Sequence, residues 1–215
     1  MRRCSGSDRF PVGRLRVGVL GGSFNPPHIG HLILASDAFE ALELDRLIVV
    51  PANANPLKGP DPLAPRPEQR LEMVKLAFGG DDRFEVSSVE IDRGGLSFMV
   101  DTLETLAAEH PGAELVLLVG IDSLETLDRW KQPQRIKELA SLAALMRGGL
   151  PRGAEAAHAE AQKSQVEIVT TRRIDVSSTE IRERIAAGLP VKGFVAESVE
   201  AYISAAKLYR QRAVD

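Results

Sequence analysis

Short apolar segments that alternate with helix-like stretches constrain the fold more than any other feature of this sequence. The segments Arg46–Pro51 and Glu114–Gly120 are dominated by branched aliphatic residues, which is typical of strands buried on both faces of a parallel sheet. Over residues 28–43 and 67–78, apolar residues recur every three or four positions, as on one face of a helix. Strands that alternate with helices predict βαβ units, and therefore an α/β fold with a doubly wound parallel sheet and helices on both faces.

The same patterns predict a single domain over residues 15–215, preceded by a flexible extension over residues 1–14. We expect strands over residues 15–20, 46–51, 84–89, 114–120, 142–146 and 166–169. We expect helices over residues 28–43, 67–78 and 98–109, short helices between residues 120 and 140, and two helices at the C-terminal end. Ligands of such sheets bind at the carboxyl ends of the strands. Functional residues should therefore directly follow Leu20, Pro51, Val119, Met146 and Val169.

Charge and composition exclude several classes of protein. A net charge of −3 and a pI of about 5.9 argue against nucleic acid as a partner, since proteins that bind it usually carry a basic excess. No apolar run reaches the length that crosses a membrane, and the N-terminal residues lack the apolar stretch of a secretory signal. The single cysteine, Cys4, fits a reducing compartment. We therefore expect a cytoplasmic protein, and a small anionic ligand held by local basic groups remains compatible with this charge.

The segment GGSFNPPHIGH, residues 21–31, directly follows the first predicted strand. Its two leading glycines let the backbone turn sharply and approach a ligand closely. His28 and His31 are three residues apart, so they share one face of the first helical turn, and Gly30 keeps bulk away between them. A helix N-terminus favours an anion through its free N–H groups and its dipole. Two imidazoles at such a position suit a triphosphate.

Other interpretations of this segment are weaker. The spacing of Gly18, Gly21 and Gly22 does not match the dinucleotide fingerprint, and the sequence contains no P-loop pattern. Zinc would need ligands beyond the two histidines, and only His110, His158 and Cys4 remain. A structural role for a histidine pair is the ordinary alternative, and the preceding glycine turn argues against it. We expect no metal site built by the protein.

A second segment, DVSSTEIRERI over residues 175–185, combines a helix start with a basic residue. Ser177 and Glu180 form the pattern of a capping box. Three hydroxyl residues in a row and Arg182 in the first turn exceed what capping needs. A cation is disfavoured at a helix N-terminus by the dipole, so its presence there indicates a nearby anion.

These two segments resemble the H-x-G-H and I-S-S-T-x-I-R elements of the nucleotidylyltransferase superfamily. Within it, five further segments resemble nicotinate-nucleotide adenylyltransferases of bacteria: PANANPLK, PEQRLEMVKLAF, SFMVDTL, LVLLVGIDSLETLDRWKQ and AYISAAKLY. Together they span nearly the whole chain from Leu15. The resemblance implies a Rossmann-like nucleotidyltransferase fold. It also implies transfer of AMP from ATP to nicotinate mononucleotide, giving nicotinate adenine dinucleotide (deamido-NAD) and pyrophosphate in NAD biosynthesis.

The resemblance also implies roles for particular residues. The catalytic residues are His28, His31 and Arg182. The ATP-binding residues are Gly21, Gly22, Ser23, Phe24, His28, His31, Gly120, Asp122, Ser177, Ser178, Thr179 and Arg182. The residues that bind nicotinate mononucleotide are Asn53, Lys58, Met99, Trp130, Lys131 and Arg147. Mg²⁺ would arrive with ATP, held mainly by phosphates and water. The partners are thus ATP and the mononucleotide, and a homodimer is compatible with the sequence.

The sequence departs from the family pattern on the side of the mononucleotide. Leu57 replaces a histidine, Phe98 and Met99 replace a Tyr-Thr pair, and Lys131 replaces a residue that is often aromatic. The family contacts the nicotinate carboxylate largely through backbone N–H groups near these positions, and such contacts tolerate changes of side chain. Two alternatives stay open: another transferase of this superfamily, making dephospho-coenzyme A or a cytidylyl product, and a nucleotide-binding sensor without turnover.

Overall fold

The computed structural model describes residues 14–57, 59, 64–124, 126–148 and 166–210. In this part of the chain a six-stranded sheet has the order β3-β2-β1-β4-β5-β6, and every neighbouring pair of strands is parallel. The strands are β1 (Arg16–Gly22), β2 (Arg46–Pro51), β3 (Phe84–Val86), β4 (Glu114–Gly120), β5 (Ala140–Arg147) and β6 (Glu167–Thr171). The predicted doubly wound parallel sheet is therefore confirmed.

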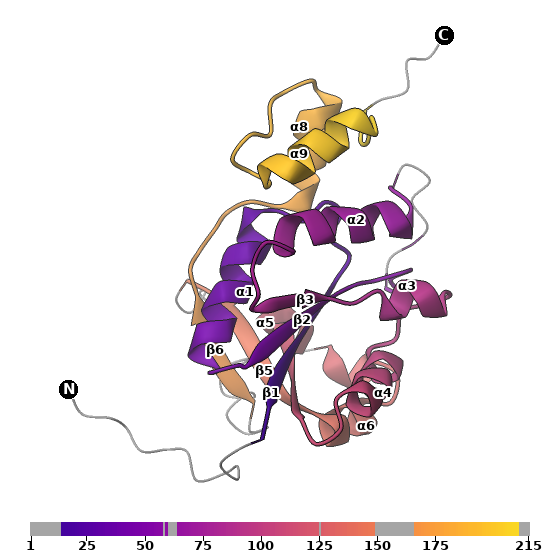
Figure 1. The fold of residues 1–215 in the computed structure, drawn as a ribbon, viewed down its shortest axis with the longest axis vertical. Helices are drawn as coiled ribbons and strands as arrows, with labels where there is room; N and C mark the ends of the chain where they lie inside the picture. The colour runs from indigo at the N-terminus through magenta and orange to yellow at the C-terminus, as the bar shows by residue number, and fades with distance from the viewer. Residues whose placement is uncertain (1–13, 58, 60–63, 125, 149–165, 211–215) are drawn as a thin grey trace, which may run out of the picture.

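Helices cover both faces of this sheet (Figure 1). The structure has α1 (Ile29–Ala41), α2 (Pro67–Phe78), α3 (Val89–Arg93), α4 (Met99–Glu109), α5 (Ile121–Leu124), the 3₁₀ turn η1 (Leu127–Arg129), α6 (Pro133–Leu139), α8 (Ser178–Ala186) and α9 (Glu197–Ala205). None of the helices in these described ranges is both long enough and apolar enough to cross a membrane.

The central strand β4 shows why the sheet is covered twice. Leu117 and Val119 belong to one buried cluster, together with Leu103 of α4. Val116 and Leu118 point the other way, into a cluster that contains side chains of α1 and α2. Each fully buried aliphatic side chain contributes about 1.5–3 kcal/mol relative to an exposed one, so the continuous apolar run of the strand stabilises both layers.

The two C-terminal helices form a third packing unit. In Figure 1 they lie beyond α1 and α2, α8 in light orange and α9 in yellow. Their buried residues Ile181, Val199 and Ile203 form a cluster with Met73 of α2. This cluster fixes α8 against the rest of the molecule, and the first turn of α8 carries one of the two sequence motifs.

Some boundaries differ from the sequence prediction. The strand expected over residues 84–89 ends at Val86, and α3 begins at Val89. This strand lies at the edge of the sheet and pairs only over Phe84–Val86 with β2, so no second neighbour holds it extended beyond Val86. The expected extension is described only at Arg14, whose Nε donates to the carbonyl of Gly112 at 2.6 Å. Residues 1–13 lie outside the described residues.

Candidate active site

The carboxyl ends of β1 and β2 meet at the start of the candidate site. Gly22 and Pro51 are partners in the parallel ladder, and the Ala52 N–H donates to the Gly22 carbonyl at 2.8 Å. Just beyond, Arg70 of α2 donates from Nη1 to the carbonyl of Ser23 at 2.9 Å and from Nη2 to that of Asn53 at 2.7 Å. The segments that follow the two strands are therefore held side by side.

The histidines lie in contact at the N-terminus of α1. Their ring centroids are 3.8 Å apart, and His28 is only 3% exposed. A Cβ placed on Gly30 would come within 3.0 Å of the His28 Nδ1, which explains the glycine between the histidines. The His28 N–H donates to Nδ1 of His31 at 3.2 Å. Because Nδ1 accepts, a neutral His31 carries its proton on Nε2, as a donor.

The helix terminus itself offers less than the sequence suggests. The Ile29 N–H, the first of α1, donates to the carbonyl of Phe194 at 2.9 Å. The His31 N–H donates to the carbonyl of His28 at 2.8 Å. These backbone donors already have acceptors, so an anion here depends more on the imidazoles and on neighbouring side chains than on free helix N–H groups.

The second motif packs directly against the first. Arg182 donates from Nη1 to the Asn25 carbonyl at 2.9 Å, although the two residues are 157 positions apart in sequence. Its Nη2 donates to the Thr179 hydroxyl at 3.2 Å. The Ser178 hydroxyl donates to the Pro26 carbonyl at 2.8 Å. Ser177 caps the helix by accepting from the Glu180 N–H at 3.1 Å, as its sequence pattern predicts.

A cavity of about 710 Å³ opens between the two motifs. Its lining combines the segment after β1, the segment after β2, the start of α2 and the first two turns of α8. Among the described residues, the basic groups on it are His31, Arg66, Arg70 and Arg182. Its other lining residues include Ser23, Phe24, Asn25, Asn53, Ser178 and Thr179. Four basic side chains and several hydroxyls suit an anion with several oxygens, such as a polyphosphate.

A second cavity, of about 380 Å³, lies beside the first and shares Ala52 and Asn55 with it. It is lined by Gly21, Gly22, Leu57, Glu90, Ser97, Phe98, Met99, Ser123, Arg129, Trp130 and Lys131, among others. The Lys131 ammonium pairs with Asp101 at 2.9 Å and lies 4.8 Å from the centre of the Phe98 ring. Trp130 is half-buried and packs against the core. This lining suits a flat ring more than a polyphosphate.

Some of the other predicted site residues lie at the two cavities and others do not. The Asn53 amide donates to the Gly95 carbonyl at 2.7 Å and the Asn53 N–H donates to the Ser97 hydroxyl at 2.9 Å. Gly120 ends β4 and Asp122 is exposed in α5, and neither is among the residues that line the two cavities. The buried His28 and the helix cap Ser177 are not among them either. Lys58 lies outside the described residues, as does the side chain of Arg147.

Sequence reasoning missed Arg70. It is 7% exposed, and burial lowers the pKa of its guanidinium. A signal was present, because Arg70 stands three and four residues before Met73 and Val74 on the buried face of α2. An arginine on the apolar face of a helix needs acceptors, and here they are the two carbonyls beside the cavity.

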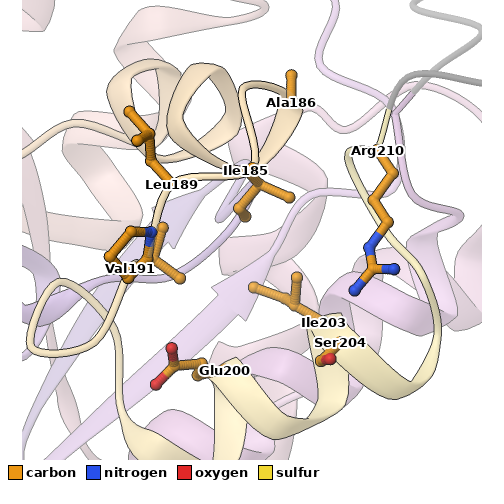
Figure 2. A pocket seen from close by; sticks show the side chains of 10 residues that line it. Ile185, Ala186, Leu189, Val191, Glu200, Ile203, Ser204 and Arg210 are labelled. Carbon is orange, nitrogen blue, oxygen red and sulfur yellow. The ribbon is translucent and has the colours of Figure 1, made fainter.

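A further cavity lies away from this site, between α8, the loop after it and α9. Its volume is about 420 Å³. Figure 2 shows Ile185, Leu189 and Val191 on one side of it and Ile203 of α9 on the other. None of its lining residues belongs to the predicted site, so we place the candidate active site in the two cavities at the strand ends.

Comparison with known proteins shows the family of this chain. Residues 19–184 match a family described as cytidylyltransferase-like. A probable nicotinate-nucleotide adenylyltransferase of Gemmatimonas aurantiaca is 46% identical over 199 residues, which cover 92% of this chain and 93% of that protein. One from Thermus thermophilus is 41% identical over 91% of this chain and all of that protein.

Solved structures show the same fold. The nicotinic acid mononucleotide adenylyltransferase of Plasmodium falciparum complexed with NaAD superposes with a TM-score of 0.69, at 16% identity, over 91% of this chain and 98% of that one. A structure described as a putative nicotinate-nucleotide adenylyltransferase from Vibrio parahaemolyticus gives a TM-score of 0.62 at 16% identity, over 92% of this chain and 96% of that one. Since the similarity to its curated relatives covers about nine tenths of its length, the chain belongs to the nicotinate-nucleotide adenylyltransferases of the cytidylyltransferase-like family.

Proposed function

We propose that this chain transfers the AMP part of MgATP to nicotinate mononucleotide and releases pyrophosphate. The observation that carries the proposal is the meeting of the two motifs: His31, Thr179 and Arg182 line one basic cavity. That cavity adjoins a second one lined by Trp130, Phe98 and Met99. A site with a polyphosphate compartment beside a ring compartment matches a donor and an acceptor that are both nucleotides. The relatives, which are named for the same acceptor, support this assignment.

The chemistry requires positioning and charge stabilisation more than a base. A phosphate oxygen of the mononucleotide attacks the α-phosphorus of ATP, a P–O bond forms to that oxygen, and the bond between the α-phosphorus and the bridging oxygen breaks. Pyrophosphate leaves with the electron pair of the broken bond. The attacking group is already an anion, so no strong general base is needed. Catalysis then comes from holding the two substrates in line and from donors aimed at the developing charge.

His31 and Arg182 are the donors that we assign to this charge. His31 lines the basic cavity and its Nδ1 accepts from the His28 N–H, and we assign its Nε2–H to a phosphate oxygen. Arg182 uses Nη1 and Nη2 on Asn25 and Thr179, and these two contacts fix its guanidinium at the cavity wall. We assign buried His28 to orienting His31, through the ring contact of 3.8 Å, as well as to the phosphates.

The remaining ATP contacts follow from the turn and the strand ends. Gly21 and Gly22 line the second cavity, and we assign their backbone to the ATP that reaches it from the first. A Cβ on Gly22 would meet the Phe24 ring at 2.9 Å. We assign Ser23, Phe24, Ser177, Ser178 and Thr179 to the phosphate side, and Gly120 and Asp122 to the nucleoside. Mg²⁺ enters with ATP as part of the substrate.

The acceptor is assigned to the cavity beside Trp130. A pyridinium ring is electron-poor and stacks well on indole, and the backbone near Met99 and Lys131 would supply N–H donors to the carboxylate. Asn53, Lys58 and Arg147 remain proposed contacts of the acceptor phosphate. We assign the chain to the cytoplasm. Its proposed reaction uses ATP, and its single cysteine allows no internal disulfide.

Pyrophosphate release with a panel of acceptors tests the proposal. Purified chain is incubated with MgATP and either nicotinate mononucleotide, nicotinamide mononucleotide or 4′-phosphopantetheine, and with CTP in place of ATP. We expect release with ATP and nicotinate mononucleotide far above every other pair. Release only with phosphopantetheine or with CTP would assign the chain to another transferase. ATP binding without release for any pair would make it a sensor.

A matched pair of variants ties the activity to the site. Arg182→Met removes the guanidinium from the cavity wall and should reduce release by more than about 10²-fold. Arg184→Met is the control, since Arg184 lies on the same helix but donates to the Pro190 carbonyl, at 2.9 Å from Nη2. Equal activity of the two variants would contradict the placement of the site.

A further inference from the structure

The chain turns back toward the active site after α9. Lys207 and Tyr209 both have positive φ, at 53° and 62°, a conformation uncommon for residues other than glycine. The Leu208 N–H donates to the Ile203 carbonyl at 3.0 Å, so the turn is closed by a hydrogen bond. An unusual backbone conformation that packing maintains calls for a functional explanation. After this turn the side chain of Tyr209 packs against the protein.

Tyr209 reaches the segment between β1 and α1. Its ring packs against the cluster that contains Met73 and Ile181, and its hydroxyl donates to Oδ1 of Asn25 at 2.7 Å. Burial raises the pKa of the Tyr209 hydroxyl above its usual range, so the group stays protonated and remains a donor at physiological pH.

Asn25 is thus held from two sides. Its side-chain oxygen accepts from Tyr209 and its backbone carbonyl accepts from Nη1 of Arg182 at 2.9 Å. Three residues later comes His28, the N-cap of α1. A shift of Asn25 would therefore move both an acceptor of Arg182 and the entry to the helix that carries the histidines.

We propose that Tyr209 is a positioning residue for the reaction: through Asn25, its hydroxyl sets the segment before α1 and the Arg182 guanidinium. The proposal rests on the proposed function, because it concerns the same site. Tyr209 touches no reacting atom in this scheme. It connects the C-terminal end of the described chain to the phosphate-binding groups. Tyr209 itself lies in neither of the two sequence motifs.

Packing of the ring alone is the competing explanation. Tyr209→Phe separates the two, because it keeps the ring and removes only the hydroxyl. A net hydrogen bond is worth about fivefold in rate if it is fully expressed in the transition state. We expect Tyr209→Phe to lower kcat/KM for MgATP about fivefold in total. The loss is divided between a lower kcat and a weaker MgATP affinity by calorimetry, with an unchanged KM for nicotinate mononucleotide.

Controls isolate the path of the effect. The ring of Tyr202, on α9, packs against the same cluster. Tyr202→Phe removes only its hydroxyl and should keep the wild-type kcat. Asn25→Ala removes the acceptor of Tyr209 but keeps the backbone carbonyl that Arg182 uses. It should reproduce the loss, and the double variant Asn25→Ala, Tyr209→Phe should lose no more than Asn25→Ala alone.

Each outcome decides the proposal. A kcat and a MgATP affinity of Tyr209→Phe equal to those of Tyr202→Phe would overturn it, as would losses that multiply in the double variant. If Asn25→Ala does not fold, the comparison of the two tyrosine variants still stands. If the wild-type chain releases no pyrophosphate, the proposed function fails, and the MgATP affinities of the two tyrosine variants then test Tyr209 separately.

Discussion

Replacing Arg70 by methionine should damage both stability and turnover. The guanidinium donates to the Ser23 and Asn53 carbonyls at 2.9 and 2.7 Å, and hydrogen bonds from charged donors are worth about 1.5–3 kcal/mol each. Two effects compensate for part of this lost free energy. The variant no longer buries a charge, and the open cavity beside Arg70 lets water reach the freed carbonyls. We expect a net loss of about 2 kcal/mol, which lowers Tm by about 4–8 °C for a domain of this size.

Turnover should fall further than stability explains. The two carbonyls belong to the segments that carry the proposed donor and acceptor contacts, and a misplacement of about 1 Å can cost about 10²-fold in rate. We therefore expect Arg70→Met to lower kcat by about 10–100-fold at a temperature where the variant is folded. Arg70→Lys keeps the charge but cannot donate to both carbonyls in the geometry of a guanidinium. Its kcat should lie between those of Arg70→Met and wild type.

The assay pairs thermal unfolding with pyrophosphate release at saturating MgATP and mononucleotide. Arg66→Met is the control, because Arg66 lines the same cavity but is exposed. It removes a cation without removing a bridge between segments. A kcat of Arg70→Met within about threefold of Arg66→Met, together with a lower Tm, would reduce Arg70 to a purely structural role and refute the reasoning.

Three further variants or substrates test the site. His31→Ala should lower kcat about 10²–10³-fold with a smaller effect on MgATP affinity by calorimetry; a kcat within threefold of wild type would contradict its role. Trp130→Ala should raise the KM of nicotinate mononucleotide through the loss of stacking worth about 0.5–2 kcal/mol, and a change in the ATP KM instead would place the indole on the other side. The ratio of kcat/KM for nicotinate over nicotinamide mononucleotide should approach about 10⁴, because N–H donors near Met99 would face the NH₂ of the amide; a ratio near one would show that these donors are absent.

The elements best predicted from the sequence are those whose local pattern is strongest. The bounds 46–51, 67–78 and 114–120 agree with the structure, since continuous aliphatic runs and a proline at a helix start leave few alternatives. The edge strand was predicted too long, because Val89 carries a strand-like side chain but has no neighbouring strand to pair with. Pairing is a tertiary property that the local sequence does not contain.

The sequence indicates which residues belong to the candidate site, but not how they are arranged in space. Each motif indicated an anion by itself, through His28 and His31 or through Arg182. Their meeting through the Asn25 carbonyl depends on how α8 packs, which no local pattern specifies. Arg70 and Tyr209 were missed for a related reason. Their signals, an arginine on an apolar helix face and a tyrosine after the last helix, acquire meaning only when their acceptors are known.

The C-terminal helices contribute residues to the candidate site that the sheet does not supply. The strand ends supply the turn, the histidines and the contacts of Arg70, and the first two turns of α8 add Ser178, Thr179 and Arg182 to the lining. That turn is attached by the Ser178 and Arg182 hydrogen bonds to the Asn25–Pro26 backbone and by the apolar cluster on α2. The groups proposed to stabilise charge therefore come from two packing units. Substitutions in the apolar contact of Ile181 with Met73 should reach the chemistry as well as the stability, because they loosen the unit that carries Arg182.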